Sequence, residues 1–368
     1  MTWLLVAAAA AAVVGLVALV VRRRPPAPSS LSAKPQVSPG PQARGTKIAF
    51  VANPTKPEAA AVRSRLLAAC AERGLPAPLW LTTTAADPGV GQAREALAAG
   101  ADVVVAVGGD GTVRAVAEAM VGSRVPMGLV PTGTGNLLAR NVDVPVNDVG
   151  GALRIVADGQ DRLVDVGWLR VDRWGAGAGP ESVYGRTDDE TGGEEHLFVV
   201  IAGLGFDGAL VADTDDDLKA RVGWVAYFLA GVRHLHGRRK QVLVTRDDGE
   251  PQTAWVRSAM IGNCGRLPGG ITLLPDAVPD DGWLDVAVVD TRGGLAGWAQ
   301  LLGEVVLQGA GMRTVLPAKI GRIDHARARR IHLEVAGSAT VQVDGDIVGD
   351  VAELTVRVEP GALLLRVP

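Results

Sequence analysis

The chain has 368 residues, with 37 lysines and arginines against 40 aspartates and glutamates, so its formal net charge is −3. It therefore lacks the strongly basic composition typical of nucleic-acid-binding proteins, and we expect no nucleic-acid partner. The length is sufficient for two domains. Its two cysteines, Cys70 and Cys264, lie far apart with no Cys/His cluster, which disfavours a zinc site and a disulfide framework and fits a reducing compartment.

The N-terminal segment differs from the rest of the chain. Residues 1–21 carry no charged side chain, and about 20 apolar residues are enough to span a membrane. Arg22, Arg23 and Arg24 follow this run, whereas a secretory signal has its positive charge before it. The positive-inside rule then predicts a single-pass transmembrane anchor at the cell membrane with cytoplasmic catalytic domains. A signal peptide or a misassigned start codon is the alternative.

Residues 22–45 are rich in proline and serine, which indicates a disordered linker. From residue 46 to residue 164, apolar runs alternate with segments of helical periodicity. This alternation predicts a doubly wound α/β domain with a parallel sheet. The predicted strands cover 47–54, 77–83, 102–109 and 126–136 (the last with its loop), and the predicted helices 58–74, 90–101 and 112–120.

Residues 165–368 have a different pattern, with many short runs of alternating polarity. They predict a second domain that is rich in sheet. Helical periodicity is confined to 218–235 and 294–309, and residues 172–196 are expected to form a mobile loop between two strands. Whether the last strand returns to the first domain stays open.

The stretch VVAVGGDGTVRAVAEAM, residues 104–120, ends an apolar run with glycines and then resumes as a helix. Gly108, Gly109 and Gly111 allow the backbone to approach a phosphate closely. The exposed N–H groups and the N-terminus of the following helix supply partial positive charge for an anion. Asp110 fits beside a phosphate only where a cation or a substrate hydroxyl is near it. The alternative is a tight turn in which Asp110 is a helix cap.

A second glycine-rich segment, PTGTGNLLARN, follows the next predicted strand. Ligands of doubly wound sheets bind beyond the carboxyl ends of the strands, so both loops are expected at one edge. That edge also carries Asn53-Pro54 and Thr82 to Thr84. GxxxxGK[ST] is absent, which disfavours a P-loop.

GGDGTV and PTGTGNLLARN, followed by GNCGRLPGGITLLPDAVPDDGWLDV and VQVDGD, resemble the diacylglycerol kinase catalytic-domain family. The resemblance runs from about Lys47 to the C-terminus. It implies a nucleotide-binding α/β domain and a β-sandwich domain with the active site between them. It also implies an ATP- and Mg²⁺-dependent lipid kinase that acts on a diacylglycerol-like or long-chain-base lipid in the membrane. A homodimer is possible, and the sequence leaves the oligomeric state open.

The resemblance carries roles to individual residues. It places Asp346 as the acceptor of the hydroxyl proton and Asp110 close to the transferred phosphate. It places a structural Mg²⁺ on the Asp281 side chain and on Val278 and Trp283. The nucleotide would meet Asn53, Thr83 or Thr84, Gly108, Gly109, Asp110, Gly111, Thr112, Gly133, Thr134, Gly135 and Asn136.

Three departures from the family pattern stand out. Arg114 replaces an asparagine, Leu137 follows Asn136 where the family has an acid, and Asp346 is one methylene shorter than the family's glutamate. Two alternatives therefore stay open. One is an NAD kinase-like or other small-molecule kinase, and the other is an inactive nucleotide-binding membrane protein.

Overall fold

The computed structural model describes residues 45–179, 186–187, 194–205, 239–267, 271–272, 274–291 and 321–368. The predicted anchor at 1–21, the linker up to residue 44 and the predicted helices at 218–235 and 294–309 lie outside these residues. Within the described ranges, no helix is long and apolar enough to cross a membrane.

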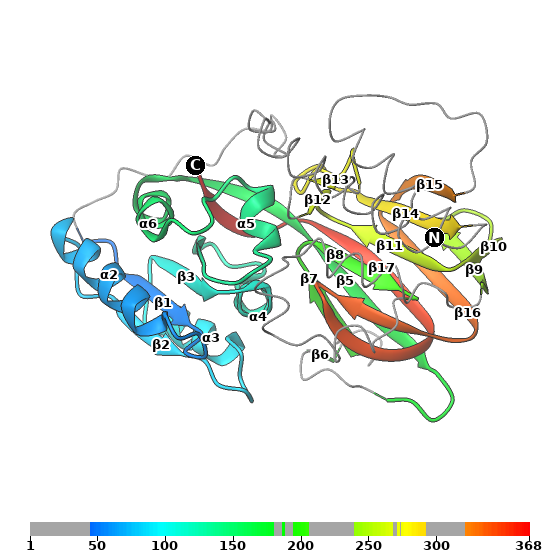
Figure 1. Ribbon diagram of the computed structural model, residues 1–368, viewed down its shortest axis with the longest axis horizontal. Helices are drawn as coiled ribbons and strands as arrows, with labels where there is room; N and C mark the ends of the chain where they lie inside the picture. The colour runs from blue at the N-terminus through cyan, green and yellow to red at the C-terminus, as the bar shows by residue number, and fades with distance from the viewer. Residues whose placement is uncertain are drawn as a thin grey trace, which may run out of the picture.

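The N-terminal lobe alternates strands and helices as the sequence predicted, with each of the predicted elements present (Figure 1). Two helices, α5 and α6, were not predicted. The elements are β1 (Ile48–Ala52), α2 (Ala59–Glu72), β2 (Leu79–Thr82), α3 (Val90–Ala98), β3 (Val103–Gly108), α4 (Asp110–Met120), β4 (Met127–Pro131), α5 (Leu137–Asn141) and α6 (Val149–Asp158).

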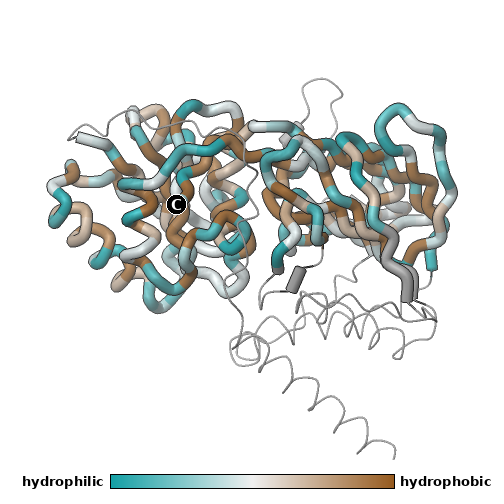
Figure 2. The backbone as a smooth tube through the Cα atoms, turned by 90° about the horizontal axis from the view of Figure 1, so that it is seen from above, coloured by the Kyte–Doolittle hydropathy of each residue, from teal (hydrophilic) through white to brown (hydrophobic). Residues whose placement is uncertain are grey.

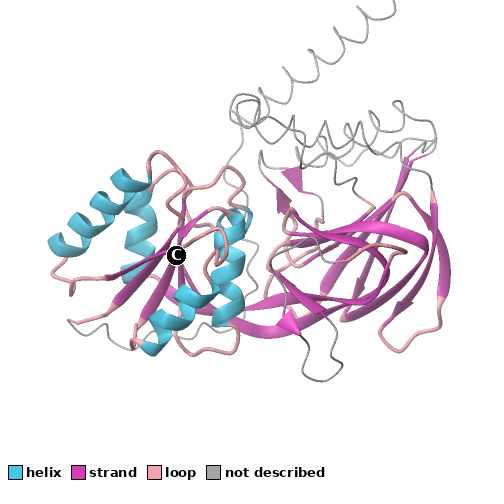
Figure 3. Cartoon of the chain, turned by 90° about the horizontal axis from the view of Figure 1, so that it is seen from below, coloured by secondary structure: helices cyan, strands magenta, loops and turns pink. Residues whose placement is uncertain are grey.

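The sheet of this lobe is parallel, in the order β4-β3-β1-β2. Helix α2 contacts α6, and α3 contacts α4, so that helices cover both faces (Figure 3). The side chains of β1, β3 and β4 are buried throughout, as expected for parallel strands covered on both faces. Figure 2 shows hydrophobic residues along the strands of both lobes and hydrophilic residues at the outer turns.

The C-terminal lobe is built of strands, in agreement with the predicted β domain. Its strands are β5 (Gln160–Trp174), β6 (Arg186–Thr187), β7 (Glu194–Phe198), β8 (Ile201–Leu204), β9 (Lys240–Arg246), β10 (Gln252–Val256), β11 (Ser258–Gly262), β12 (Arg266–Leu267), β13 (Ile271–Thr272), β14 (Leu284–Thr291), β15 (Gly321–Ala328), β16 (Arg330–Val343) and β17 (Asp346–Val367).

Two long strands connect the lobes. β5 and β17 pair antiparallel from Val351↔Trp174 to Val367↔Gln160, and the end of β17 lies parallel to β4 through Leu365↔Met127. The sheet therefore continues from one lobe into the other (Figure 1). Such continuity fixes the position of the start of β17 relative to the strands of the first lobe.

A buried ion pair stabilises this junction. The Arg366 guanidinium on β17 pairs with the Asp161 carboxylate on β5, with one contact of 3.1 Å, and also donates to the Val156 carbonyl oxygen at 2.9 Å. Both side chains are largely buried. Loss of one partner of a buried pair is costly because the remaining charge is left without compensation.

We predict that Arg366→Ala lowers the free energy of unfolding by about 3 kcal/mol, measured by chemical denaturation. The control is Arg73→Ala, which removes an exposed ion pair to Asp158 and should cost less than about 1 kcal/mol. Equal effects of the two variants would contradict this account of the junction.

Candidate active site

The first glycine-rich loop joins β3 to α4. β3 ends at Gly108, and α4 begins two residues later at Asp110, so the chain reverses within a single residue. A Cβ on Gly108 would lie 2.6 Å from the Thr112 Cβ atom. The turn therefore requires glycine, and the first N–H groups of α4 face the end of the sheet.

The second glycine-rich loop, residues 132–136, packs directly on the first. A Cβ on Gly133 would lie 2.5 Å from the Gly109 Cα atom, and a Cβ on Gly109 would lie 3.3 Å from the Gly133 Cα atom. A side chain at Gly133 cannot be accommodated at this distance, and one at Gly109 would make a tight contact that the second loop would have to yield to. The close approach of the two backbones therefore depends on glycine at position 133. The Thr132 N–H also donates to the Gly108 carbonyl oxygen at 2.9 Å.

Asp110 connects the two loops. Its carboxylate accepts the Asn136 N–H at 2.8 Å and the Leu137 N–H at 2.6 Å. Burial raises the pKa of Asp110, while these two hydrogen bonds act in the opposite direction. The carboxylate thus holds the start of α5, and its place beside the transferred phosphate stays a prediction. Asp110 therefore shapes the second loop.

Asn136 closes the second loop from within. Its backbone is left-handed, with φ 49°, and its side chain accepts from the Gly133 N–H at 3.0 Å and donates to the Gly133 carbonyl oxygen at 2.7 Å. Gly135 packs against Asp110, where a Cβ would lie 2.6 Å from a carboxylate oxygen. The Thr134 side chain is exposed at the tip.

The ends of β1 and β2 lie next to these loops. The Asn53 backbone N–H donates to the Val107 carbonyl oxygen at 3.0 Å, and its side-chain amide lies 3.5 Å from the Thr112 hydroxyl. Thr83 is buried and its N–H donates to the Ala52 carbonyl oxygen at 3.0 Å. Thr84 instead forms a turn, because its hydroxyl accepts the Asp87 N–H. The structure thus brings Asn53, Thr83 and Thr112 together at one edge.

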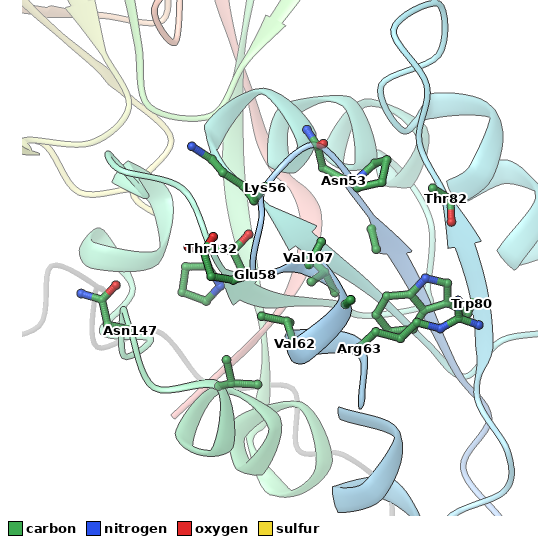
Figure 4. A pocket seen from close by; sticks show the side chains of 16 residues that line it. Asn53, Lys56, Glu58, Val62, Arg63, Trp80, Thr82, Val107, Thr132 and Asn147 are labelled. Carbon is green, nitrogen blue, oxygen red and sulfur yellow. The ribbon is translucent and has the colours of Figure 1, made fainter. Parts of the chain in front are cut away.

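A cavity of about 490 Å³ opens at the same edge, between the N-terminal ends of α2 and α6 (Figure 4). Two of its lining residues belong to this region, because Val107 precedes the first glycine loop and Thr132 begins the second. Trp80 lies on its wall, with the Arg63 guanidinium 5.2 Å from the ring centre. The volume is in the range of small-molecule binding sites.

The C-terminal lobe contributes two acids from the turn between β16 and β17. The buried Asp344 carboxylate accepts the N–H groups of Val199, Val200 and Ile201 at 2.8–2.9 Å. Burial raises the pKa of Asp344 to about 6, against the effects of Arg114 and the three hydrogen bonds. Asp346 is 43% exposed, and its carboxylate pairs with the Arg114 guanidinium on α4. The predicted proton acceptor therefore contacts the helix that starts at the first glycine loop.

In the predicted magnesium loop, residues 278–283, the groups assigned to the metal form contacts within the chain. The Asp281 carboxylate accepts the Trp283 N–H at 3.0 Å and pairs with the Arg327 guanidinium, while the Val278 carbonyl oxygen accepts the Asp281 N–H. Carboxylate and carbonyl oxygens suit Mg²⁺, but this carboxylate already has a cationic partner. As arranged here, the loop does not fit Mg²⁺, and no described group of three or more acids, histidines or cysteines could hold a metal. The assignment of this loop to Mg²⁺ stays a prediction.

Arg327 also lies 3.4 Å from the Asp285 carboxylate. Burial raises the pKa of Asp285 to about 6, and the neighbouring Asp281 and Asp276 add to this effect while Arg327 opposes it. The guanidinium thus compensates a cluster of negative charges. The sequence offered no signal for this contact, because Arg327 lies 46 positions after Asp281.

The comparisons with known proteins agree with this geometry. Residues 47–169 match the family described as the diacylglycerol kinase catalytic domain, and residues 199–367 match the YegS C-terminal NAD kinase β-sandwich-like domain. The chain belongs to the diacylglycerol kinase catalytic-domain family. The first matched range covers the N-terminal lobe and the first part of β5, and the second covers most of the C-terminal lobe and the whole of β17, including the end that pairs with β4.

Relatives with curated names are similar over most of their length. A "Diacylglycerol kinase" of Mycobacterium tuberculosis is 28% identical over 252 residues, which are 68% of this chain and 72% of the relative. A "Probable lipid kinase YegS-like" of Pseudomonas aeruginosa is 30% identical over 282 residues, which are 74% of this chain and 79% of the relative. A crystal structure of a diacylglycerol kinase from Bacillus anthracis shares the fold, with a TM-score of 0.63 at 21% identity, over 88% of this chain and 97% of that one.

We predict that Arg327→Ala lowers the thermal unfolding midpoint by about 2 °C or more, because Asp281 and Asp285 then lack a cationic partner. Millimolar Mg²⁺ should raise the midpoint of this variant more than that of the wild type. The control is Arg329→Ala, whose guanidinium lies 4.6 Å from the centre of the Trp283 ring. A wild type that gains as much from Mg²⁺ as the variant would show that the loop binds the metal with Arg327 in place.

Proposed function

We propose that this chain is an ATP- and Mg²⁺-dependent kinase that phosphorylates the hydroxyl group of a diacylglycerol-like or long-chain-base lipid. Membership of a lipid kinase family supports the reaction class. The proposal rests mainly on the ion pair between Asp346 and Arg114 of α4. Through this contact an acid of the C-terminal lobe lies beside the helix of the N-terminal lobe that we propose to bind phosphate.

The glycine loops supply the nucleotide site in this proposal. Phosphate oxygens would accept hydrogen bonds from the backbone N–H groups at the start of α4, where the helix dipole adds positive potential. Glycine at positions 109 and 133 leaves room for close approach of the phosphates. The neighbouring cavity offers space for the rest of a nucleotide. Mg²⁺ bound with ATP would neutralise charge on the phosphate oxygens.

Asp346 is the proposed general base. The lipid hydroxyl oxygen attacks the γ-phosphorus, and the bond from that phosphorus to the β,γ-bridging oxygen breaks, so that ADP leaves. The hydroxyl proton passes to the Asp346 carboxylate. The chain's own residues therefore hold the phosphates, orient the acceptor and take up one proton.

The predicted anchor remains part of the proposal. An enzyme tethered at residues 1–21 meets a lipid confined to the same membrane, which raises their effective concentration. Arg22 to Arg24 would then lie on the cytoplasmic side. A homodimer at the membrane stays open.

The test is a phosphorylation assay with labelled ATP and a panel of diacylglycerol, long-chain bases, NAD and fructose phosphate. We expect label on a lipid only, and Asp346→Asn should lower kcat by about 10²–10⁴ while KM for ATP stays within about twofold. The control is Asp350→Asn, an exposed acid on the same strand that bonds to the Thr340 hydroxyl. Labelled NAD or fructose phosphate would favour the small-molecule kinase, and ATP binding without turnover on any acceptor would favour the inactive protein.

A further inference from the structure

Arg114 is a buried arginine inside the helix that follows the first glycine loop. It lies four residues, or about one turn, after Asp110, so the two side chains project from the same side of α4. Its side chain is 2% exposed. A guanidinium is charged at all accessible pH values, and its burial is costly unless carboxylates or carbonyl oxygens compensate it.

The partner of this buried charge comes from the other lobe. The Arg114 Nη2 atom pairs with the Asp346 Oδ2 atom across 232 positions of the chain. Helix α4 also contacts β7 and β17, so the pair lies within a packed contact between the lobes. The contact uses Asp346 Oδ2, and the side chain is 43% exposed.

Arg114 also acts on the second acid of the turn. Its positive charge opposes the rise in the pKa of Asp344, whose carboxylate holds the backbone at 199–201. The guanidinium thus favours the charged form of Asp344 and also pairs with Asp346. The exposed Asp346 side chain has two rotatable bonds, and a charge-assisted contact restricts them.

We propose that Arg114 is the positioning residue that fixes the Asp346 carboxylate over the start of α4, so that the long arginine and the short aspartate work as one matched pair. This inference rests on the proposed function, since Asp346 is the base of that reaction. The contact spans the two lobes because the long side chain of Arg114 reaches a carboxylate on the short stem of Asp346.

The test is an exchange of both residues in the full chain, assayed on the lipid that the wild type phosphorylates. Arg114→Asn should lower kcat about 10²-fold with KM for ATP within about twofold, because a misplaced base slows the chemical step. Asp346→Glu should lower kcat about tenfold, since the extra methylene displaces the paired carboxylate. The double variant Arg114→Asn/Asp346→Glu should recover to within about fivefold of the wild type.

Two controls separate positioning from a structural role. Arg124→Asn changes an exposed arginine just after the same helix and should leave kcat unchanged. Arg114→Lys keeps the charge but not the planar fork, and should lie between wild type and Arg114→Asn. If Arg114→Asn does not fold, Arg114→Gln takes its place in the same exchange, because its side chain is also shorter than that of arginine, and recovery with Asp346→Glu is again expected.

Losses that simply multiply in the double variant would overturn the inference, and so would full kcat in Arg114→Asn. A wild type with no turnover on any lipid contradicts the proposed function instead. In that case the same variants are compared by thermal unfolding. If the shift of the midpoint in the double variant then equals the sum of the shifts in the two single variants, the residues do not act as a pair, and the inference is overturned without any lipid substrate.

Discussion

The contact between the backbones at Gly109 and Gly133 is the constraint on which the candidate site depends. It exists because β3 and β4 are adjacent and parallel, with Gly108 opposite Pro131, so both chains leave the sheet at the same edge. A side chain at Gly133 would push the loops apart. Asp110 then fixes the second loop to the first, and Thr112 faces Asn53 at the end of β1. The geometry of the candidate site thus follows from the order of the strands.

The second lobe is held to this edge by the sheet itself. β5 and β17 run through both lobes, and the C-terminal end of β17 pairs with β4. The start of β17, which carries Asp346, is therefore positioned by the same strand that completes the N-terminal sheet. Arg114 closes the contact from α4. Two segments more than 200 positions apart in sequence therefore meet at one candidate site.

The sequence predicted what depends on local patterns. The apolar runs at 47–54 and 102–109 and the helical periodicity between them are local, and the structure has the predicted elements there. Helix α6 was missed because its first turn contains Gly150 and Gly151, which have low helix propensity. Asp148 nevertheless caps this helix by accepting the Gly151 N–H at 2.9 Å. Side-chain partners were beyond prediction, since Arg114–Asp346 and Arg327–Asp281 join residues that only the tertiary fold brings together. The same reason explains why the hydrogen bonds that Asp110 accepts at the start of α5 were not predicted.

The most direct test of this account is calorimetric titration of ATP with Mg²⁺ into the wild type and into Gly133→Ala. The added Cβ would lie 2.5 Å from the Gly109 Cα atom, so we expect the loops to separate and the affinity for ATP to fall by about tenfold or more, which is about 1.4 kcal/mol. Gly150→Ala is the matched control, because a Cβ there makes only an ordinary contact at 3.6 Å with the Asp148 carboxylate. Unchanged ATP affinity in a folded Gly133→Ala variant would contradict the claim that the paired glycine loops bind the nucleotide.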